Sequence, residues 1–233
     1  MLKNFFKSKC ISDLPQGVEK NRSLKDRLTF FERAELYQRT NFISGVYCEF
    51  GVHTAQTFRM ALNTLGQHRK RSTSCDHFYA FDTFGGMPEP SGIDRSRRWK
   101  KGVNATTENE FRRLVEPDLF RVSLVPGLFS ESLPSFHFPS GSSVSLAYID
   151  CDYYQSTAEV VEFITPYLRH GSIVAFDDWD CYYYDPRRGQ QRACMEWREN
   201  NQGNFELVEF VKIGASGMSF VFLEKDKIGL EIL

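Results

Sequence analysis

The sequence predicts an α/β fold in which a mostly parallel sheet carries helices on both faces. Strand-like apolar segments alternate with helix-like segments five times along the chain, and such alternation is typical of parallel sheets. The last two strand-like segments are separated by too few residues for a parallel crossover, which predicts an antiparallel hairpin. With 233 residues, 41% of them hydrophobic, the chain suits one compact domain, or one domain with a small appendage.

In the first half, helices are expected at 23–41, 54–66 and 106–115, and strands at 45–52, 77–84 and 120–127. Ser23 and Thr54 are expected to cap the first two helices, because their side chains can accept from free backbone N–H groups. Residues 1–44 are interpreted as an N-terminal arm and helix that precede a main domain at 45–233.

In the second half, a helical turn is expected in "FSESLPSF", strands at 143–150 and 171–178, helices at 156–169 and 189–200, and the hairpin at 204–214 and 216–225. Pro166 is expected to bend the last turn of its helix. The segment 85–105 is rich in Gly and Pro and carries five basic residues between Arg95 and Lys101. It is interpreted either as a solvated loop or as a lid over a site.

Composition excludes several classes of protein. A net charge of −1 and a pI of about 6.5 give no general bias toward nucleic acid or anionic membranes. No apolar run approaches a membrane span, and no secretory signal develops, so a cytoplasmic location is expected. The six cysteines are scattered, which favours free thiols over disulfides or zinc. An exposed N-terminal helix would permit a homodimer.

Polar residues at the ends of the first two strands indicate a nucleoside ligand. Ligands of parallel sheets bind at the carboxyl ends of the strands. Gly51 allows close backbone approach after the first strand, where Glu49 also lies. Asp82, at the end of the next strand, is placed to accept hydrogen bonds from both ribose hydroxyls.

Aspartates at the ends of two later strands indicate a metal site. Asp150, Asp177 and Asp178 are expected at the tips of neighbouring strands, where like charges repel and a divalent ion would relieve the repulsion. An oxygen-only ligand set favours Mg²⁺, or Mn²⁺ or Ca²⁺, over zinc. Asp152 would point away from Asp150 if the strand continued, which favours a supporting or helix-capping role.

The chain resembles class I S-adenosylmethionine-dependent methyltransferases, and more narrowly the macrocin O-methyltransferase family. The matching stretches, over about 45–200, are "VYCEFGV", "FDTFGGMPEP", "VPGLFSESLP", "YIDCDYYQST", "IVAFDDW" and, loosely, "RGQQRACMEW". The resemblance implies a Rossmann-like, seven-stranded methyltransferase sheet and Mg²⁺-dependent methylation of a hydroxyl on a sugar or another small natural product. It departs after "EFGV", where this chain has "HTAQT" in place of further glycines.

The resemblance also implies roles for individual residues. Glu49 and Gly51 would flank the methionine part of the cofactor, Asp82 would bind its ribose, and Asp150, Asp177 and Asp178 would hold the metal. The full cofactor-binding set expected is Glu49, Gly51, Thr54, Asp82, Thr83, Gly127, Phe129 and Asp150, with Gly127 and Phe129 near the adenine.

The sequence defines the methyl acceptor and the general base of the reaction less closely. Asp150 and Asp152 are the catalytic candidates, with His53 a further possible base or only a helix cap. Four aromatics follow the aspartate pair, and they are expected either to line the acceptor pocket or to fill the core: Trp179, Tyr182, Tyr183 and Tyr184.

Other classes remain open at this point. The string "IDCD" also resembles the start of the DxDx[TV] motif of haloacid-dehalogenase-type phosphatases, but here Tyr154 stands where that motif has Thr or Val. A nucleotide-sugar glycosyltransferase would use the two aspartates of "DCD" to bind a metal ion and the diphosphate of its substrate. This interpretation leaves Glu49 and Asp82 without a role. A non-catalytic nucleoside-binding protein is a third alternative, and the intact aspartates argue against it.

Overall fold

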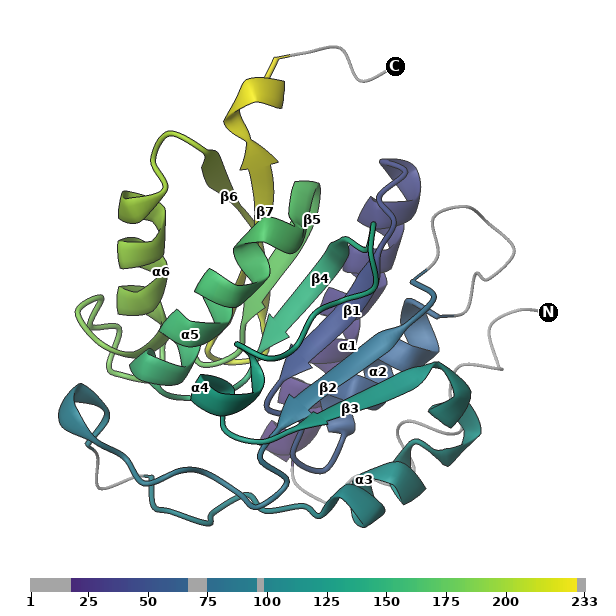
Figure 1. The fold of residues 1–233 in the computed structure, drawn as a ribbon, viewed down its shortest axis with the longest axis vertical. Helices are drawn as coiled ribbons and strands as arrows, with labels where there is room; N and C mark the ends of the chain where they lie inside the picture. Colours follow the sequence, from purple (N-terminus) through teal and green to yellow (C-terminus); the bar gives the residue numbers. More distant parts are fainter. Residues whose placement is uncertain (1–17, 67–74, 96–98, 230–233) are drawn as a thin grey trace.

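The computed structural model describes residues 18–66, 75–95 and 99–229, and its centre is a seven-stranded sheet in the order β3-β2-β1-β4-β5-β7-β6 (Figure 1). The strands are β1 Val46–Phe50, β2 Phe78–Asp82, β3 Val122–Pro126, β4 Val144–Ile149, β5 Leu168–Phe176, β6 Phe205–Ile213 and β7 Gly217–Glu224. β1 to β5 pair in parallel, and β7 pairs antiparallel with both β5 and β6. The predicted mostly parallel sheet with a C-terminal hairpin is confirmed.

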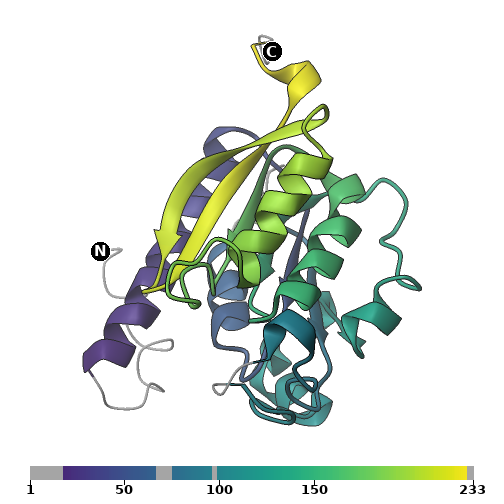
Figure 2. The same ribbon diagram turned by 90° about the vertical axis from the view of Figure 1, so that its left-hand side faces the viewer.

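Helices cover both faces of the sheet, as predicted. They are α1 Val18–Thr40, α2 Gln56–Thr64, α3 Glu108–Leu114, α4 Phe129–Ser132, α5 Tyr154–Ile164 and α6 Gly189–Asn200, with 3₁₀ turns η1 Gly92–Asp94, η2 Glu116–Arg121, η3 Thr165–Tyr167 and η4 Lys225–Lys227. Side chains of α1, α2 and α3 pack into one core and those of α5 and α6 into the other. Figure 2 shows α1 on one side of the sheet and α5 and α6 on the opposite side.

The central strands are buried on both faces, so their sequences read as continuous apolar runs. In β4, Tyr148 belongs to the core under α1 and α2, while Ala147 and Ile149 belong to the core under α5 and α6. The register aligns Phe50 with Ile149 and Ile149 with Phe176. The residues that follow β1, β4 and β5 therefore emerge side by side at one edge of the sheet.

Gly51 is required by this alignment. Its φ is +88°, and a Cβ built there would lie 1.9 Å from the backbone oxygen of Asp150. Any side chain would therefore push the end of β1 away from the end of β4. The sequence predicts that Gly51 lets backbone approach a ligand closely. In the structure it lets the end of β1 approach the end of the neighbouring strand β4.

Three local expectations are corrected. Ser23 lies inside α1, which already includes Val18. The N-cap of α2 is Ala55 in a left-handed conformation, with no side-chain cap, so Thr54 does not cap it. Leu168 and Arg169 belong to β5 instead of the preceding helix. The helix α5 ends at Ile164, and Pro166 lies in the 3₁₀ turn Thr165–Tyr167 that leads straight into the strand.

The predicted arm at the N-terminus falls mostly on residues 1–17, which lie outside the described residues. The helix α1 that follows packs onto the sheet through Phe30 and Phe31. The division at residues 44 and 45 stays a prediction. Within the described part of the chain, no helix has both the length and the apolar character to cross a membrane.

Candidate active site

A cavity of about 300 Å³ opens at the carboxyl ends of β1, β2 and β4. Its wall includes six of the expected site residues: Gly51, Asp82, Thr83, Phe129, Asp150 and Asp152. It does not include the remaining ones: Glu49, Thr54, Gly127, Asp177, Asp178, Trp179, Tyr182, Tyr183 and Tyr184. The cavity lies where ligands of parallel α/β sheets bind.

Asp82 joins the loops that follow β1 and β2. Its Oδ2 accepts hydrogen bonds from the backbone N–H groups of Val52, at 2.8 Å, and His53, at 3.3 Å. Its Oδ1 accepts from the N–H of Phe84 at 2.9 Å. The hydroxyl of Thr83 also lies 3.4 Å from Oδ1, but it has a closer acceptor in the backbone oxygen of Gly86, at 2.7 Å. Since each carboxylate oxygen has two lone pairs, Asp82 is fixed at the cavity wall and Oδ1 keeps acceptor capacity for a ligand.

The segment after β3 forms another part of the wall. Gly127 stands just outside the cavity, and Leu128, Phe129 and Ser130 line it. The backbone N–H of Gly127 donates to the backbone oxygen of Asp82 at 3.0 Å, which ties this segment to the end of β2. The ring of Phe129 also contacts Phe50, with centroids 5.9 Å apart, so an apolar surface lies beside the Asp82 carboxylate.

Glu49 lies beneath the site, fully buried between β1 and α2. The hydroxyl of Thr57 donates to its Oε1 at 2.5 Å, and the hydroxyl of Tyr47 donates to its Oε2. Burial raises the pKa of Glu49 to about 8, although both hydroxyl donors oppose the shift. A direct contact with the cofactor stays a prediction for this residue.

Asp150, Asp177 and Asp178 converge at the ends of β4 and β5, with one oxygen of each within 4.8 Å of the others. Burial, and next the carboxylates of Asp177 and Asp178, raise the pKa of Asp150 well above its usual range. Burial and Asp177 raise the pKa of Asp178 to about 6. The three side chains that the sequence placed on neighbouring strands therefore form a cluster of buried like charges.

This cluster fits a hard divalent cation. Two oxygens bound to one Mg²⁺ at about 2.1 Å lie about 3.0 Å apart in neighbouring positions and about 4.2 Å apart in opposite positions. The three oxygens, all within 4.8 Å of one another, therefore need to move only modestly toward a shared ion. All three ligands are carboxylates, which Mg²⁺, Mn²⁺ and Ca²⁺ prefer. Among the Asp, Glu, His and Cys side chains of the described residues, these three are the ones that lie close enough together to hold a metal ion.

Sequence reasoning missed two residues that organise this cluster. Arg27 of α1 pairs with Asp177 through Nε, at 2.9 Å from Oδ1, and through Nη2. Gln190 of α6 is fully buried; its Oε1 accepts from the N–H of Asp178 at 2.8 Å, and its Nε2 donates to the oxygen of Ile149 at 3.0 Å. A signal for Arg27 existed, because it lies on the apolar stripe of its helix, three residues after buried Leu24.

Asp152 follows the cluster in a left-handed conformation, with φ at +58°. β4 ends at Ile149, so the strand alternation that would have turned Asp152 away does not reach it, and the residue lines the cavity. Its backbone N–H donates to Oδ2 of Asp178 at 3.0 Å. A left-handed non-glycine residue costs conformational energy and is often found at functional sites.

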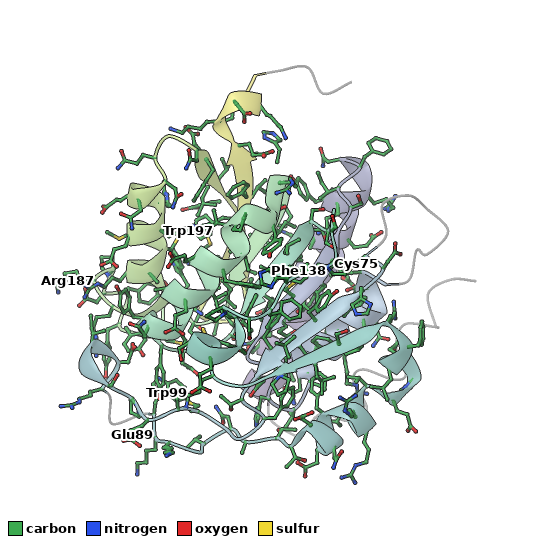
Figure 3. The ribbon with its side chains drawn as sticks, in the orientation of Figure 1. Cys75, Glu89, Trp99, Phe138, Arg187 and Trp197 are labelled. Atoms are coloured by element: carbon green, nitrogen blue, oxygen red, sulfur yellow. The ribbon has the colours of Figure 1, made fainter. Side chains whose placement is uncertain are left out.

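The described parts of the segment 85–105, residues 85–95 and 99–105, lie below the sheet edge, where Figure 3 labels Glu89 and Trp99. Met87, Pro88 and Glu89 line the cavity. Asp94 is buried, and its carboxylate accepts from the first backbone N–H groups of α5, those of Tyr154 and Gln155, at 2.7 and 3.0 Å. This part of the segment is therefore a docked cover in the structure, and its movement as a lid stays a prediction.

The four aromatics after the aspartate pair occupy different environments. Trp179 packs on Phe176 and Phe220. Tyr182 is buried, and its hydroxyl donates to the backbone oxygen of Asp152 at 3.2 Å. Tyr183 and Tyr184 are 98% and 65% exposed. Acceptor binding by these residues stays a prediction.

A smaller cavity of about 180 Å³ lies on the α1 side of the cluster. Its wall includes Ser23, Arg27 and Thr54, and it shares His53 and Asp150 with the larger cavity. Asp150 is therefore accessible from two sides, and Arg27 borders a space that solvent and ions can enter.

The sheet order and the site at its carboxyl edge define a Rossmann-like methyltransferase fold, and the comparisons with known proteins agree. A family model described as "Methyltransferase domain" matches residues 48–179, and the chain belongs to this family. The expectation of a class I S-adenosylmethionine-dependent methyltransferase is confirmed, which argues against the phosphatase and glycosyltransferase alternatives. The narrower macrocin-type resemblance stays a prediction.

Several solved structures share this fold. The O-methyltransferase NovP is 23% identical, with a TM-score of 0.64 over 84% of this chain and 79% of that chain. CalS11, a calicheamicin methyltransferase, is 21% identical, with a TM-score of 0.64 over 92% of this chain and 96% of that chain. TomG from Streptomyces achromogenes, solved with S-adenosylmethionine, is 14% identical, with a TM-score of 0.54 over 91% and 83%. No curated protein gave a significant match.

Proposed function

We propose that this chain transfers a methyl group from S-adenosylmethionine to a hydroxyl of a sugar or another small natural product, with the help of a divalent metal ion. The observation that carries the proposal is the cluster of Asp150, Asp177 and Asp178, of which Asp150 lines the same cavity as Asp82. NovP, TomG and the calicheamicin methyltransferase support the choice of acceptor class, because they are methyltransferases, two of them described as O-methyltransferases and two tied to named natural products.

The cofactor would lie along the ends of β1, β2 and β3. Asp82 offers a fixed carboxylate to the ribose, Phe129 offers an apolar face to the adenine, and the loop at Gly51 brings backbone close to the methionine part. S-adenosylmethionine supplies a methyl group on a sulfonium, and its transfer needs mainly alignment of the acceptor oxygen. These residues would provide that alignment by holding the cofactor on one side of Asp150.

Asp150, Asp177 and Asp178 would hold the metal. A bound divalent ion would orient an acceptor hydroxyl and make its proton more acidic. Asp150 and Asp152 both line the cavity and are the residues we expect to receive that proton, with His53 as a further candidate. An acceptor with neighbouring hydroxyls suits a metal that keeps more than one coordination position open.

The test is a methylation assay with purified protein, S-adenosylmethionine, Mg²⁺ and a panel of sugars, glycosides and catechols, read by mass spectrometry. We expect one hydroxyl-bearing class to gain a methyl group and the reaction to stop in excess EDTA. Full activity in EDTA would remove the metal from the mechanism. Tight binding of S-adenosylmethionine without transfer to any acceptor would favour a non-catalytic nucleoside-binding protein.

A further inference from the structure

Among the described residues, Arg27 is the basic side chain that forms an ion pair with the carboxylate cluster. Its Nε donates to Oδ1 of Asp177 at 2.9 Å, and its Nη2 pairs with Oδ2. The two side chains are only 20% and 6% exposed. The pair is therefore part of the buried site, unlike an exposed surface ion pair, which contributes little.

The pair also occupies most of the acceptor capacity of Asp177. Besides Arg27, the hydroxyl of Tyr148 donates to Oδ1 of Asp177. Oδ1 therefore has two donors and Oδ2 has one. One lone pair on Oδ2 remains for a metal, whereas none of the described residues donates a hydrogen bond to the side chain of Asp150.

The net charge of the cluster follows from its three carboxylates and the guanidinium of Arg27. A bound metal takes carboxylates in their deprotonated form, so the three side chains carry −3 in the metal-bound state, and the guanidinium, which stays protonated in proteins, adds +1. The remaining −2 equals the charge that one divalent cation neutralises. We infer that Arg27 is a built-in counterion that sets the site to the charge of a divalent ion and keeps trivalent ions from binding much more tightly. The inference rests on the metal site of the proposed function.

The inference predicts how charge substitutions change metal affinity. Arg27→Gln leaves −3 at the site, so affinity should rise about tenfold for Mn²⁺ and more for Tb³⁺, because the attraction scales with the product of the charges. Arg27→Lys keeps the charge and should stay within about threefold of the wild type, by the same law. Arg33→Gln, on the exposed face of the same helix, is the matched control and should change nothing.

A double variant, Arg27→Gln with Asp177→Asn, replaces the ion pair by two amides of similar shape and returns the site to −2. The double variant should still fold, because both members of the ion pair are replaced and neither is left as an unpaired buried charge. Its preference for Mn²⁺ over Tb³⁺ should stay within about threefold of the wild type, whereas its affinity for both ions should fall, because an amide oxygen replaces one of the three carboxylate ligands.

The experiment is calorimetric titration of the metal-free, full-length proteins with Mn²⁺ and Tb³⁺, with neither cofactor nor acceptor present. The metal-induced rise in the unfolding midpoint gives a second readout. The inference is overturned if Arg27→Gln binds Mn²⁺ no more tightly than the wild type, or if Arg27→Lys changes as much as Arg27→Gln. Absence of binding to every variant would overturn it together with the metal site, while methyl transfer in the assay above would still support the methyltransferase function.

Discussion

On the β1–β2 side of the site, each carboxylate is held by neutral donors, whereas on the β4–β5 side three carboxylates face one another. Glu49 accepts from two hydroxyls, and Asp82 accepts from backbone N–H groups. Asp150, Asp177 and Asp178 converge within 4.8 Å, with Arg27 as their paired cation. On the first side neutral donors hold the carboxylates in place, and on the second side a negative charge remains that a cation can neutralise.

The largest effect should come from the β4–β5 side. Asp178→Asn keeps the shape of the side chain and an oxygen for the N–H of Asp152, but removes a metal-binding charge. Turnover should fall by about a thousandfold, or ~4 kcal/mol, while the Kd for S-adenosylmethionine changes little. Steady-state kinetics and calorimetry check this, with exposed Asp226→Asn as control. An equal loss of cofactor affinity would mean that the two sides are not separate.

The next largest effect should be a pH dependence of stability set by Glu49. Burial raises its pKa from 4.5 to about 8, so the folded protein keeps a proton that the unfolded chain loses. The stability that this carboxyl contributes is complete below about pH 4.5 and is lost as the pH rises through about 8.

Glu49→Gln cannot ionise, so the variant should be as stable as the wild type at low pH and more stable by a few kcal/mol above pH 8. Urea unfolding at several pH values checks this, with exposed Glu162→Gln as control. If the difference between variant and wild type stays flat with pH, Glu49 is ionised in the folded protein and the two sides of the site are alike in charge.

Asp82→Ala should weaken binding of S-adenosylmethionine by about 1–3 kcal/mol, the loss expected for hydrogen bonds to a charged group. Mn²⁺ affinity should be unchanged, because the metal ligands lie on β4 and β5. Titration with the cofactor and with Mn²⁺ separates the two. Unchanged cofactor affinity would remove Asp82 from the site.

The smallest effects should come from the exposed aromatics. Tyr183→Ala and Tyr184→Ala should raise the acceptor KM severalfold, about 1 kcal/mol, with unchanged unfolding midpoints and cofactor affinity. Tyr182→Ala serves as the contrast, because this ring is buried and its loss should lower stability instead. If KM is unchanged in both exposed variants, the acceptor is held elsewhere, and the 85–105 segment is the next candidate.

The sequence by itself determined the sheet and the edge where the site lies. Alternation of apolar runs with helical spacing predicted the strands to within a few residues, because burial on both faces leaves a local pattern in each strand. The same pattern put Asp150 and the Asp177–Asp178 pair at the ends of two strands. Parallel pairing then made their proximity a consequence of the topology.

The groups that surround those aspartates come from distant parts of the chain and follow from the three-dimensional packing. Arg27 and Asp177 are 150 residues apart, and Gln190 reaches Asp178 from a different helix. Likewise, the docking of Asp94 onto α5 has no local signature in a loop rich in Gly and Pro. Such contacts depend on helices crossing the sheet edge, and the free energy that selects them comes from packing and charge compensation between distant segments, which no short window of sequence contains.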